Sequence, residues 1–125
     1  MNEYTGGCLC GDVKYRVTSE PVHPHLCSCR QCQKSTGAIT SAWVGFPIEE
    51  LLWDGPKGEP AYYRSSEKCL RGFCSKCGSL VCAVDDGSKN ITLTIATLDD
   101  PGAVVPREGH SYPESAPSWW KVLIE

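Results

Sequence analysis

The nine cysteines of this 125-residue chain constrain its fold more than any other feature. Seven of them fall into three short motifs: Cys8-Leu9-Cys10, Cys27-Ser28-Cys29-Arg30-Gln31-Cys32 and Cys74-Ser75-Lys76-Cys77. The odd number of cysteines and the two pairs separated by one residue argue against a disulfide framework, because a bridge between such close neighbours would close a strained ring. Spacing of this kind is typical of metal sites, where several thiolates bind one ion, and zinc is the ion most often held in this way.

A structural zinc takes four ligands, so seven clustered cysteines divide naturally into four and three, although the arithmetic permits several groupings. The grouping that we favour places a structural zinc on the first and third motifs, at Cys8, Cys10, Cys74 and Cys77. A second zinc would then bind Cys27, Cys29 and Cys32, with its fourth position free for water or substrate. In the alternative, both sites are closed and structural, and His23, His25 or a remaining cysteine supplies the eighth ligand.

Length and composition predict one zinc-binding domain that spans residues 1–125. Apolar residues make up 41% of the chain and charged residues 22%, which is normal for a globular protein. No apolar run approaches the roughly 18 residues of a membrane-spanning helix, and the polar N-terminus lacks the design of a signal peptide, so we expect a cytoplasmic protein without a membrane partner. The net charge of −3 provides no field that would attract nucleic acid.

Residue patterns predict a mainly β chain with little helix. Alternating apolar residues predict a strand at 13–17, directly after a turn that carries the first cysteine pair. Residues 29–36 are expected to form a short helical turn that ends at Gly37, and Pro47 to begin a single helical turn. The tail from residue 101 holds four of the nine prolines and is expected to be irregular. Further strands are predicted at residues 39–46, 61–64, 80–84 and 90–96.

Three ordered stretches, Gly6 to Tyr15, Cys27 to Ala38 and Arg71 to Ser79, resemble the glutathione-dependent formaldehyde-activating enzyme family, also called the centromere protein V family. The segments Leu98-Asp99-Asp100-Pro101, Gly109-His110 and Ser118-Trp119 are also similar to the family's ending. The resemblance implies a β-tent fold of small coiled antiparallel sheets stapled by zinc, and it supports the division into four and three cysteines. The chain departs from the family pattern at Ser28, where histidine is frequent, and at Gln33, where arginine is common.

The resemblance also implies a carbon-sulfur lyase activity, in which glutathione adds to formaldehyde to give S-(hydroxymethyl)glutathione. Three thiolates make a bound zinc a weak Lewis acid, so a soft thiol suits it better than water. We therefore expect Cys27, Cys29 and Cys32 to bind the catalytic zinc and not to act as nucleophiles. His110 is a candidate proton donor to the developing alkoxide, and a packing role is its alternative.

Four basic residues flank the cysteine motifs: Arg30, Lys34, Arg71 and Lys76. Of these, Lys34 and Arg71 are the candidates for attracting an anionic thiol such as glutathione, and solvated charge is the alternative. The expected partners are thus a small-molecule thiol and an aldehyde, with two zinc ions per chain. Two other functions stay open, namely a zinc-stapled protein-binding module without catalysis and a redox or metal-buffering protein.

The remaining cysteines and the tryptophans are predicted to serve packing. Free cysteine behaves as a small apolar residue, so Cys69 and Cys82 are expected in the core, with Cys69 a weaker candidate for an extra metal ligand. Trp43 and Trp53 lie in or beside predicted strands and are expected in the core. The pair Trp119-Trp120 is expected to anchor the tail there, because each ring can bury a large apolar area.

Overall fold

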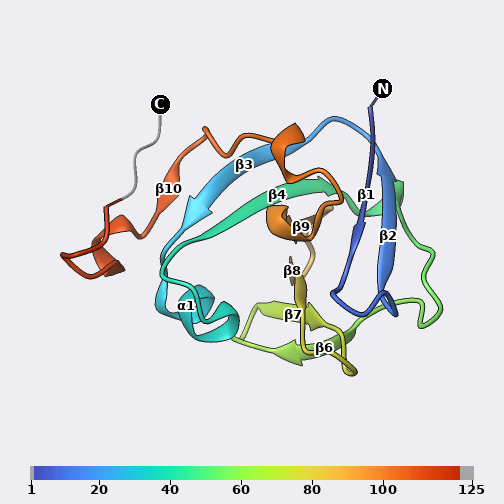
Figure 1. Cartoon of the computed structure of the whole chain (residues 1–125), viewed down its shortest axis with the longest axis horizontal. Helices are drawn as coiled ribbons and strands as arrows, with labels where there is room; N and C mark the ends of the chain where they lie inside the picture. The colour runs from blue at the N-terminus through green and yellow to red at the C-terminus, as the bar shows by residue number, and fades with distance from the viewer. Residues whose placement is uncertain (1, 122–125) are drawn as a thin grey trace.

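The computed structural model describes residues 2–121, which form two β-sheets and one short α-helix (Figure 1). The smaller sheet is antiparallel, with the strand order β1-β2-β5. Its strands are β1 (Glu3–Gly7), β2 (Lys14–Thr18) and β5 (Leu51–Trp53). The helix α1 (Arg30–Thr36) lies on the opposite side of the molecule from this sheet.

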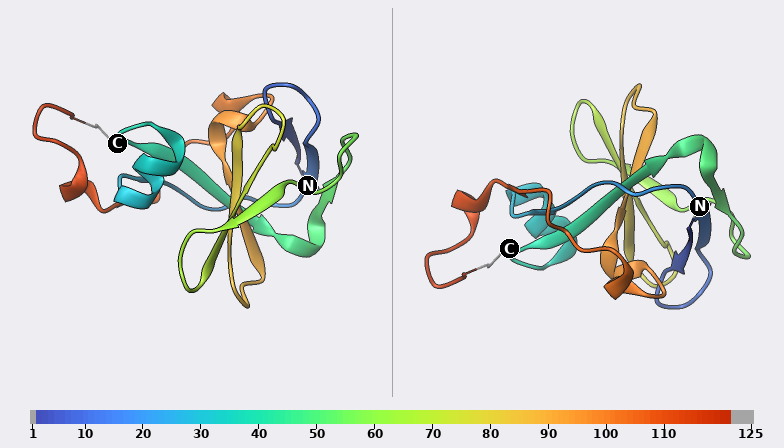
Figure 2. Two further views of the ribbon diagram at one scale, coloured as in Figure 1. Left: turned by 90° about the horizontal axis from the view of Figure 1, so that it is seen from below. Right: turned by 90° about the horizontal axis from the view of Figure 1, so that it is seen from above.

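The larger sheet has seven strands in the order β10-β3-β4-β9-β8-β7-β6. In chain order these are β3 (Val22–Cys27), β4 (Ser41–Pro47), β6 (Ala61–Arg64), β7 (Cys69–Phe73), β8 (Leu80–Asp85), β9 (Asn90–Thr94) and β10 (His110–Ser111). All neighbours are antiparallel except β10 and β3, which are parallel. Figure 2 shows the resulting coil, in which β8 crosses β4 steeply. The predicted mainly β fold of small coiled sheets with little helix is confirmed.

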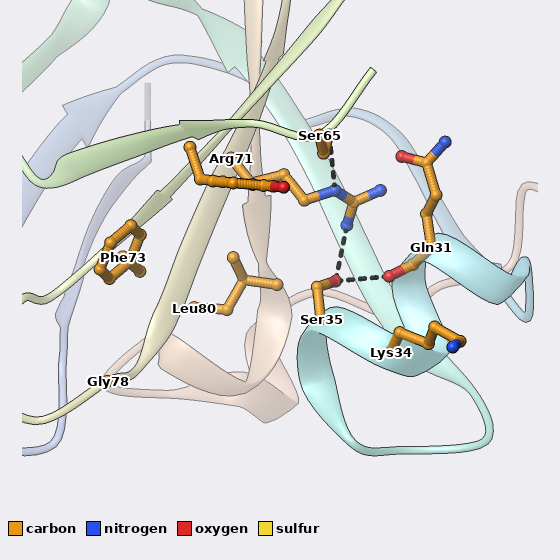
Figure 3. Close-up of a pocket in the computed structure, with 9 residues that line it drawn as sticks. Gln31, Lys34, Ser35, Ser65, Arg71, Phe73, Gly78 and Leu80 are labelled. Carbon is orange, nitrogen blue, oxygen red and sulfur yellow. Dashed lines mark hydrogen bonds between the residues drawn. The ribbon is translucent and has the colours of Figure 1, made fainter.

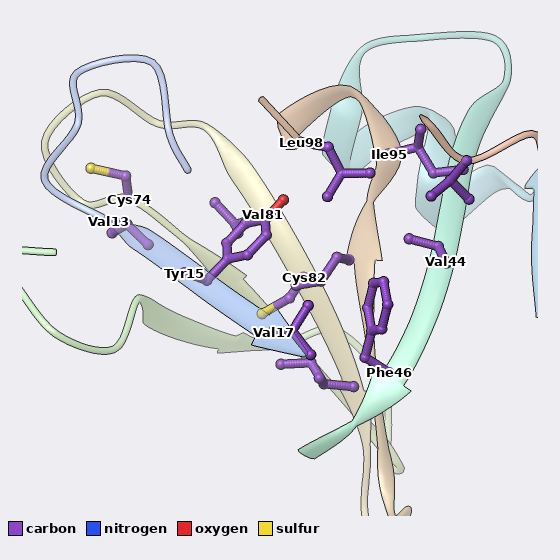
Figure 4. Packing of buried hydrophobic residues seen from close by; sticks show 13 residues of the cluster. Val13, Tyr15, Val17, Val44, Phe46, Cys74, Val81, Cys82, Ile95 and Leu98 are labelled. Atoms are coloured by element: carbon purple, nitrogen blue, oxygen red, sulfur yellow. The ribbon is translucent and has the colours of Figure 1, made fainter. Parts of the chain in front are cut away.

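One hydrophobic core lies between the two sheets (Figure 4). The alternation predicted for β2 is confirmed, since Val13, Tyr15 and Val17 are all buried. Cys82 packs in this core as expected, and burial raises the pKa of its thiol to about 12. The core also contains apolar residues from β4, β8 and β9: Val44, Phe46, Val81, Ile91 and Leu93.

The helix α1 is defined by its two caps. Cys29 has extended backbone geometry, and its Sγ accepts a hydrogen bond from the Cys32 N–H over 3.3 Å. Gly37 ends the helix in the left-handed region, with φ at 74°, and its N–H donates to the Gln33 carbonyl. The predicted helical turn at 29–36 is therefore confirmed. Its N-cap is Cys29, one of the predicted metal ligands.

Several boundaries differ from the predictions. The strand expected at 90–96 ends at Thr94, because residues 95–97 turn into a 3-10 helix that is closed by the Leu98 N–H on the Ile95 carbonyl. Strands β1, β3, β5, β7 and β10 were not predicted as strands. In β7, Gly72 weakens the local strand signal, yet it permits close packing, since a Cβ there would lie 2.5 Å from the Cys82 sulfur.

The prediction for the two C-terminal tryptophans is wrong. Trp119 is 71% exposed and Trp120 is 40% exposed, so neither ring anchors the tail in the core. Instead the two rings pack edge to face, and the indole N–H of Trp120 donates to the Thr40 hydroxyl over 3.0 Å. Trp43 is buried as predicted, and Trp53 packs against Tyr15 at the core edge.

Within residues 2–121, no helix is both long and apolar enough to cross a membrane. The assignment of one domain to residues 1–125 stays a prediction, and residues 1 and 122–125 lie outside the described part of the chain.

Close packing at Gly6 leads to a prediction about stability. A Cβ at this position would lie 2.3 Å from the Tyr15 hydroxyl and 2.4 Å from the Thr97 carbonyl. We expect Gly6→Ala to lower the free energy of unfolding by about 1–3 kcal/mol in urea titrations of the metal-loaded protein, because the strand must shift. Gly102→Ala is the control, since the nearest atom there is at 3.5 Å. Equal effects of the two substitutions would contradict the close approach.

Candidate metal centres

The first group of sulfurs joins two loops that are far apart in the sequence. The Sγ atoms of Cys8, Cys10, Cys74 and Cys77 all lie within 4.8 Å of one another. Cys10 is 3.6 Å from Cys8 and 3.7 Å from Cys74, measured between sulfurs. A tetrahedral zinc with bonds of about 2.3 Å separates its sulfurs by about 3.8 Å. The four residues, called here the four-cysteine cluster, therefore fit such an ion.

Local hydrogen bonds shape both loops of the four-cysteine cluster. The Val13 N–H donates to the Cys8 sulfur over 3.3 Å, and the Gly78 N–H donates to the Cys74 carbonyl over 2.8 Å. Gly78 has φ at 82°, which a Cys-x-x-Cys-Gly turn requires. The Ser79 hydroxyl, 3.2 Å from the Cys77 sulfur, lowers the pKa of that thiol to about 5 and so favours the thiolate that a metal needs.

The second group, called the three-cysteine cluster, consists of Cys27, Cys29 and Cys32. Cys27 ends β3, Cys29 caps α1 and Cys32 lies in the first turn of α1. Their sulfurs are also within 4.8 Å of one another, and Cys27 and Cys32 are 3.4 Å apart. The donor set suits a soft divalent ion such as zinc, and among residues 2–121 no further histidine, cysteine or carboxylate joins it.

The histidines considered as a closing ligand do not join the cluster, although His25 lines the smaller cavity together with Cys27 and Cys32. The ring of His25 stacks on His23 at 4.4 Å, and its Nδ1 lies 2.8 Å from the His23 carbonyl oxygen. His23 approaches Glu108 at 3.9 Å on the exposed surface. Neither ring belongs to the three-cysteine cluster, so within the described residues the cluster contains three protein ligands.

Arg71 contacts the three-cysteine cluster directly. Its guanidinium nitrogens lie 3.6 and 3.7 Å from the Cys32 sulfur, and they also donate to the Ser35 and Ser65 hydroxyls (Figure 3). Arg71 is only 8% exposed and lies over the Trp43 ring. The hydrogen bond to Cys27, together with the Arg71 charge, lowers the pKa of Cys32 to about 5. Arg71 is therefore a buried counter-charge to Cys32, and the alternative of a solvated charge is wrong.

His110 reaches the same region from the C-terminal tail. Its Nε2 lies 2.7 Å from the hydroxyl of Ser28, which is fully buried and also 2.8 Å from the Thr40 hydroxyl. Because Ser28 stands between Cys27 and Cys29, this contact links β10 to the backbone of the cluster. His110 is thus beside the cluster, with one ring nitrogen occupied by Ser28, and its role as a proton donor stays a prediction.

Gln33 is a supporting residue that the sequence patterns did not identify. Its side-chain amide donates to the carbonyls of Ser28, Ile39 and Ser115, and its oxygen accepts from Arg30. Gln33 is buried beneath the cluster. Both departures from the family pattern, at Ser28 and Gln33, therefore belong to the hydrogen-bonded support of the cysteines.

Two cavities meet at Arg71. The larger, of about 460 Å³, lies between α1 and strands β6 to β8, and both Lys34 and Arg71 line it (Figure 3). The smaller, of about 260 Å³, is lined by Cys27 and Cys32 of the cluster and by Cys69. Lys34 and Arg71 therefore line the same cavity, and their role in attracting an anionic thiol stays a prediction. Cys69 is half-buried and belongs to neither cluster, and burial raises the pKa of its thiol.

Comparisons with known proteins agree with this architecture. A family model described as "Glutathione-dependent formaldehyde-activating enzyme" matches residues 3–115. A Halomonas elongata protein provisionally given that same name is 27% identical over 124 residues, which cover 94% of this chain and 79% of the relative. A Podospora anserina protein with the same provisional name is 30% identical over 83 residues, but the match spans 62% of this chain and only 39% of that relative.

A solved structure shares the fold. The crystal structure of a Rhodobacter sphaeroides protein superposes with a TM-score of 0.63 and covers 86% of this chain and 99% of that one. The two sequences are 20% identical. The likeness supports the fold and carries no inference about activity.

The two clusters are predicted to contribute unequally to stability. The four-cysteine cluster connects residues more than sixty positions apart, whereas the three-cysteine cluster spans six residues, so metal at the first restricts the unfolded chain far more. We expect Cys10→Ser to lower the free energy of unfolding by several kcal/mol in urea titrations, and Cys29→Ser to lower it much less. Cys69→Ser, outside both clusters, is the control. A larger loss for Cys29→Ser would contradict this assignment.

Arg71 is predicted to strengthen metal binding at the three-cysteine cluster only. We expect Arg71→Met to weaken the more labile metal about tenfold in competition titrations with a chelator, because Cys32 loses its cationic hydrogen-bond donor. Affinity at the four-cysteine cluster should not change. Arg64→Met is the control, since Arg64 is exposed and paired with Asp86. Equal weakening of both metals by Arg71→Met would identify a general loss of folding instead.

Proposed function

The chain belongs to the glutathione-dependent formaldehyde-activating enzyme family, and from this membership we propose that it catalyses the addition of a thiol to a small aldehyde. Glutathione and formaldehyde are the proposed pair, and S-(hydroxymethyl)glutathione is the product, as in a carbon-sulfur lyase acting in the synthetic direction. The proposal places this activity in the cytoplasm.

The observation that carries the proposal is a cluster of three sulfurs with no fourth protein ligand among the described residues. Cys27, Cys29 and Cys32 would hold a zinc ion there, and the four-cysteine cluster would hold a structural one. A zinc at the three-cysteine cluster would keep the sulfur of a bound thiol in its reactive thiolate form at neutral pH. Cys27 and Cys32 both line the smaller cavity, which offers a small molecule a place beside the cluster.

The residues around the cluster have distinct proposed roles. Three thiolates exceed the charge of a divalent ion, and the buried Arg71 guanidinium offsets that excess beside Cys32. As the new carbon-sulfur bond forms, the aldehyde oxygen gains the carbonyl electron pair and needs a proton. His110 is the proposed donor of that proton, because its ring lies against Ser28 in the middle of the motif.

Lys34 and Arg71 are the proposed groups that attract the anionic thiol. Both line the larger cavity, and Lys34 forms no ion pair with any other described residue. The positive charge next to the cluster would raise the local concentration of an anionic substrate.

A protein-binding module is the second candidate function, and the tail favours it. Trp119 and Tyr112 are 71% and 61% exposed, and aromatic rings of this kind are frequent in protein interfaces. This function requires no catalysis, and an added thiol would then bind to neither metal.

Catalysis can be tested directly. Thiols add to formaldehyde unaided, so the rate of S-(hydroxymethyl)glutathione formation, measured by exchange NMR, must be compared with a protein-free reaction at the same pH. We expect the zinc-loaded protein to exceed that rate at least tenfold. Cys29→Ala should fall to the uncatalysed rate and contain one zinc per chain in place of two. Full activity of Cys29→Ala with its zinc content unchanged would reject the proposed centre.

A further inference from the structure

We propose that the larger cavity binds the body of one of the two substrates, and that this substrate is an organic carboxylate with a flat apolar body. The inference rests on the proposed function for its catalytic meaning. It keeps the proposed reaction, the addition of a thiol to an aldehyde, and assigns the cavity at Lys34 and Arg71 to a carboxylate with an apolar ring in place of glutathione.

One wall of the cavity is apolar. Tyr63 of β6, Phe73 of β7 and Leu80 of β8 line it from the sheet side. Figure 3 shows Phe73 and Leu80 on the side opposite α1. Tyr63 is 68% exposed, so a ligand that covers its ring would remove apolar surface from water. A flat body fits such a wall, because aromatic rings pack well against one another.

The opposite wall is polar and positively charged. Gln31, Lys34 and Ser35 line it from α1, and Arg71 spans the space between the sheet and the helix (Figure 3). Among residues 2–121, no acidic side chain lines the cavity. Arg71 is already bonded to Ser35, Ser65 and Cys32, whereas Lys34 has no carboxylate partner among the described residues. Lys34 is therefore the group with an unused charge for an incoming carboxylate.

This lining matches neither member of the proposed pair well. Formaldehyde has two heavy atoms and needs no cavity of about 460 Å³. Glutathione has an ammonium group in addition to its two carboxylates, and the cavity offers no acid to pair with that ammonium. A monocarboxylate with an aromatic ring would use both walls, because its ring would pack on Tyr63 and Phe73 and its charge would meet Lys34.

The cavity also communicates with the three-cysteine cluster. Arg71 lines both cavities, and its guanidinium lies 3.6 Å from the Cys32 sulfur. Cys32 itself stands between Gln31 and Lys34 in the sequence of α1. A body held in the larger cavity would thus lie next to the cluster, with the Arg71 side chain between them.

Equilibrium binding tests the site without reference to activity. The probe is 4-methylbenzoate, and acetate and 4-methylbenzamide are the comparison ligands, since one lacks the ring and the other lacks the charge. We expect 4-methylbenzoate to bind at least tenfold tighter than either, by calorimetry or by chemical-shift titration. Lys34→Gln should lower the affinity for 4-methylbenzoate to that for the uncharged 4-methylbenzamide. Phe73→Leu should also lower the affinity for 4-methylbenzoate, because it weakens the contact with the ligand's ring. Lys57→Gln, an exposed lysine outside the cavity, is the control.

Kinetics then identify which substrate occupies the cavity. In one arm, 4-carboxybenzaldehyde reacts with 2-mercaptoethanol; in the other, formaldehyde reacts with 4-mercaptobenzoate. We expect one arm to show a KM at least tenfold below that of its uncharged analogue, benzaldehyde or thiophenol. Lys34→Gln should abolish this difference, and the Lys57→Gln control should retain it.

Two results would overturn the inference. One is the absence of saturable 4-methylbenzoate binding to the folded, zinc-loaded protein; the other is binding that Lys34→Gln and Phe73→Leu leave unchanged while thermal unfolding shows both variants to be folded. Saturable, Lys34-dependent binding by a protein that accelerates neither arm, nor the reaction of glutathione with formaldehyde, would instead reject the proposed function and support the carboxylate site alone. The two failures are therefore distinguishable.

Discussion

The meeting of four cysteine sulfurs between the β1–β2 loop and the β7–β8 turn is the constraint on which the rest of the structure depends. Cys74 lies in the shared core, and Cys8 and Cys77 pack against it, so metal coordination and apolar packing act on the same residues. The chain has few long regular elements. A metal that binds only the folded protein stabilises the fold, and a tighter metal stabilises it more. A metal at the four-cysteine cluster would therefore give a small β protein of this kind stability that a larger core would otherwise provide.

This constraint also positions the second cluster. Strand β7 ends one residue before Cys74, and its residues Phe73, Arg71 and Cys69 face either the cavities or the three-cysteine cluster. A metal at the four-cysteine cluster therefore holds the strand from which Arg71 reaches Cys32. In this way a closed structural site can support an open one, although the two share no ligand.

The three-cysteine cluster combines a buried negative charge with a dense polar support. Arg71 compensates the charge on one side, and Ser28 and Gln33 hold the backbone on the other. Buried polar groups of this kind are favourable only when each is paired, and within residues 2–121 no buried side-chain nitrogen or oxygen is left without a partner. These hydrogen bonds restrict the backbone that carries the cysteines, which would limit the ordering that metal binding must impose.

Much of this arrangement follows from local sequence. Cysteine spacing identified the three motifs as metal ligands and left several groupings open; the favoured division into four and three, which the family resemblance supported, is the one in which the sulfurs lie together. Gly37 predicted the end of α1. Only the tertiary structure decided which side chains from distant parts of the sequence contact the three-cysteine cluster. Arg71 meets Cys32 across 39 residues and His110 meets Ser28 across 82, and both contacts depend on the register of the larger sheet, which no local pattern encodes. The exposure of Trp119 and Trp120 was likewise decided by the tertiary structure, since it depends on where the folded chain places the tail.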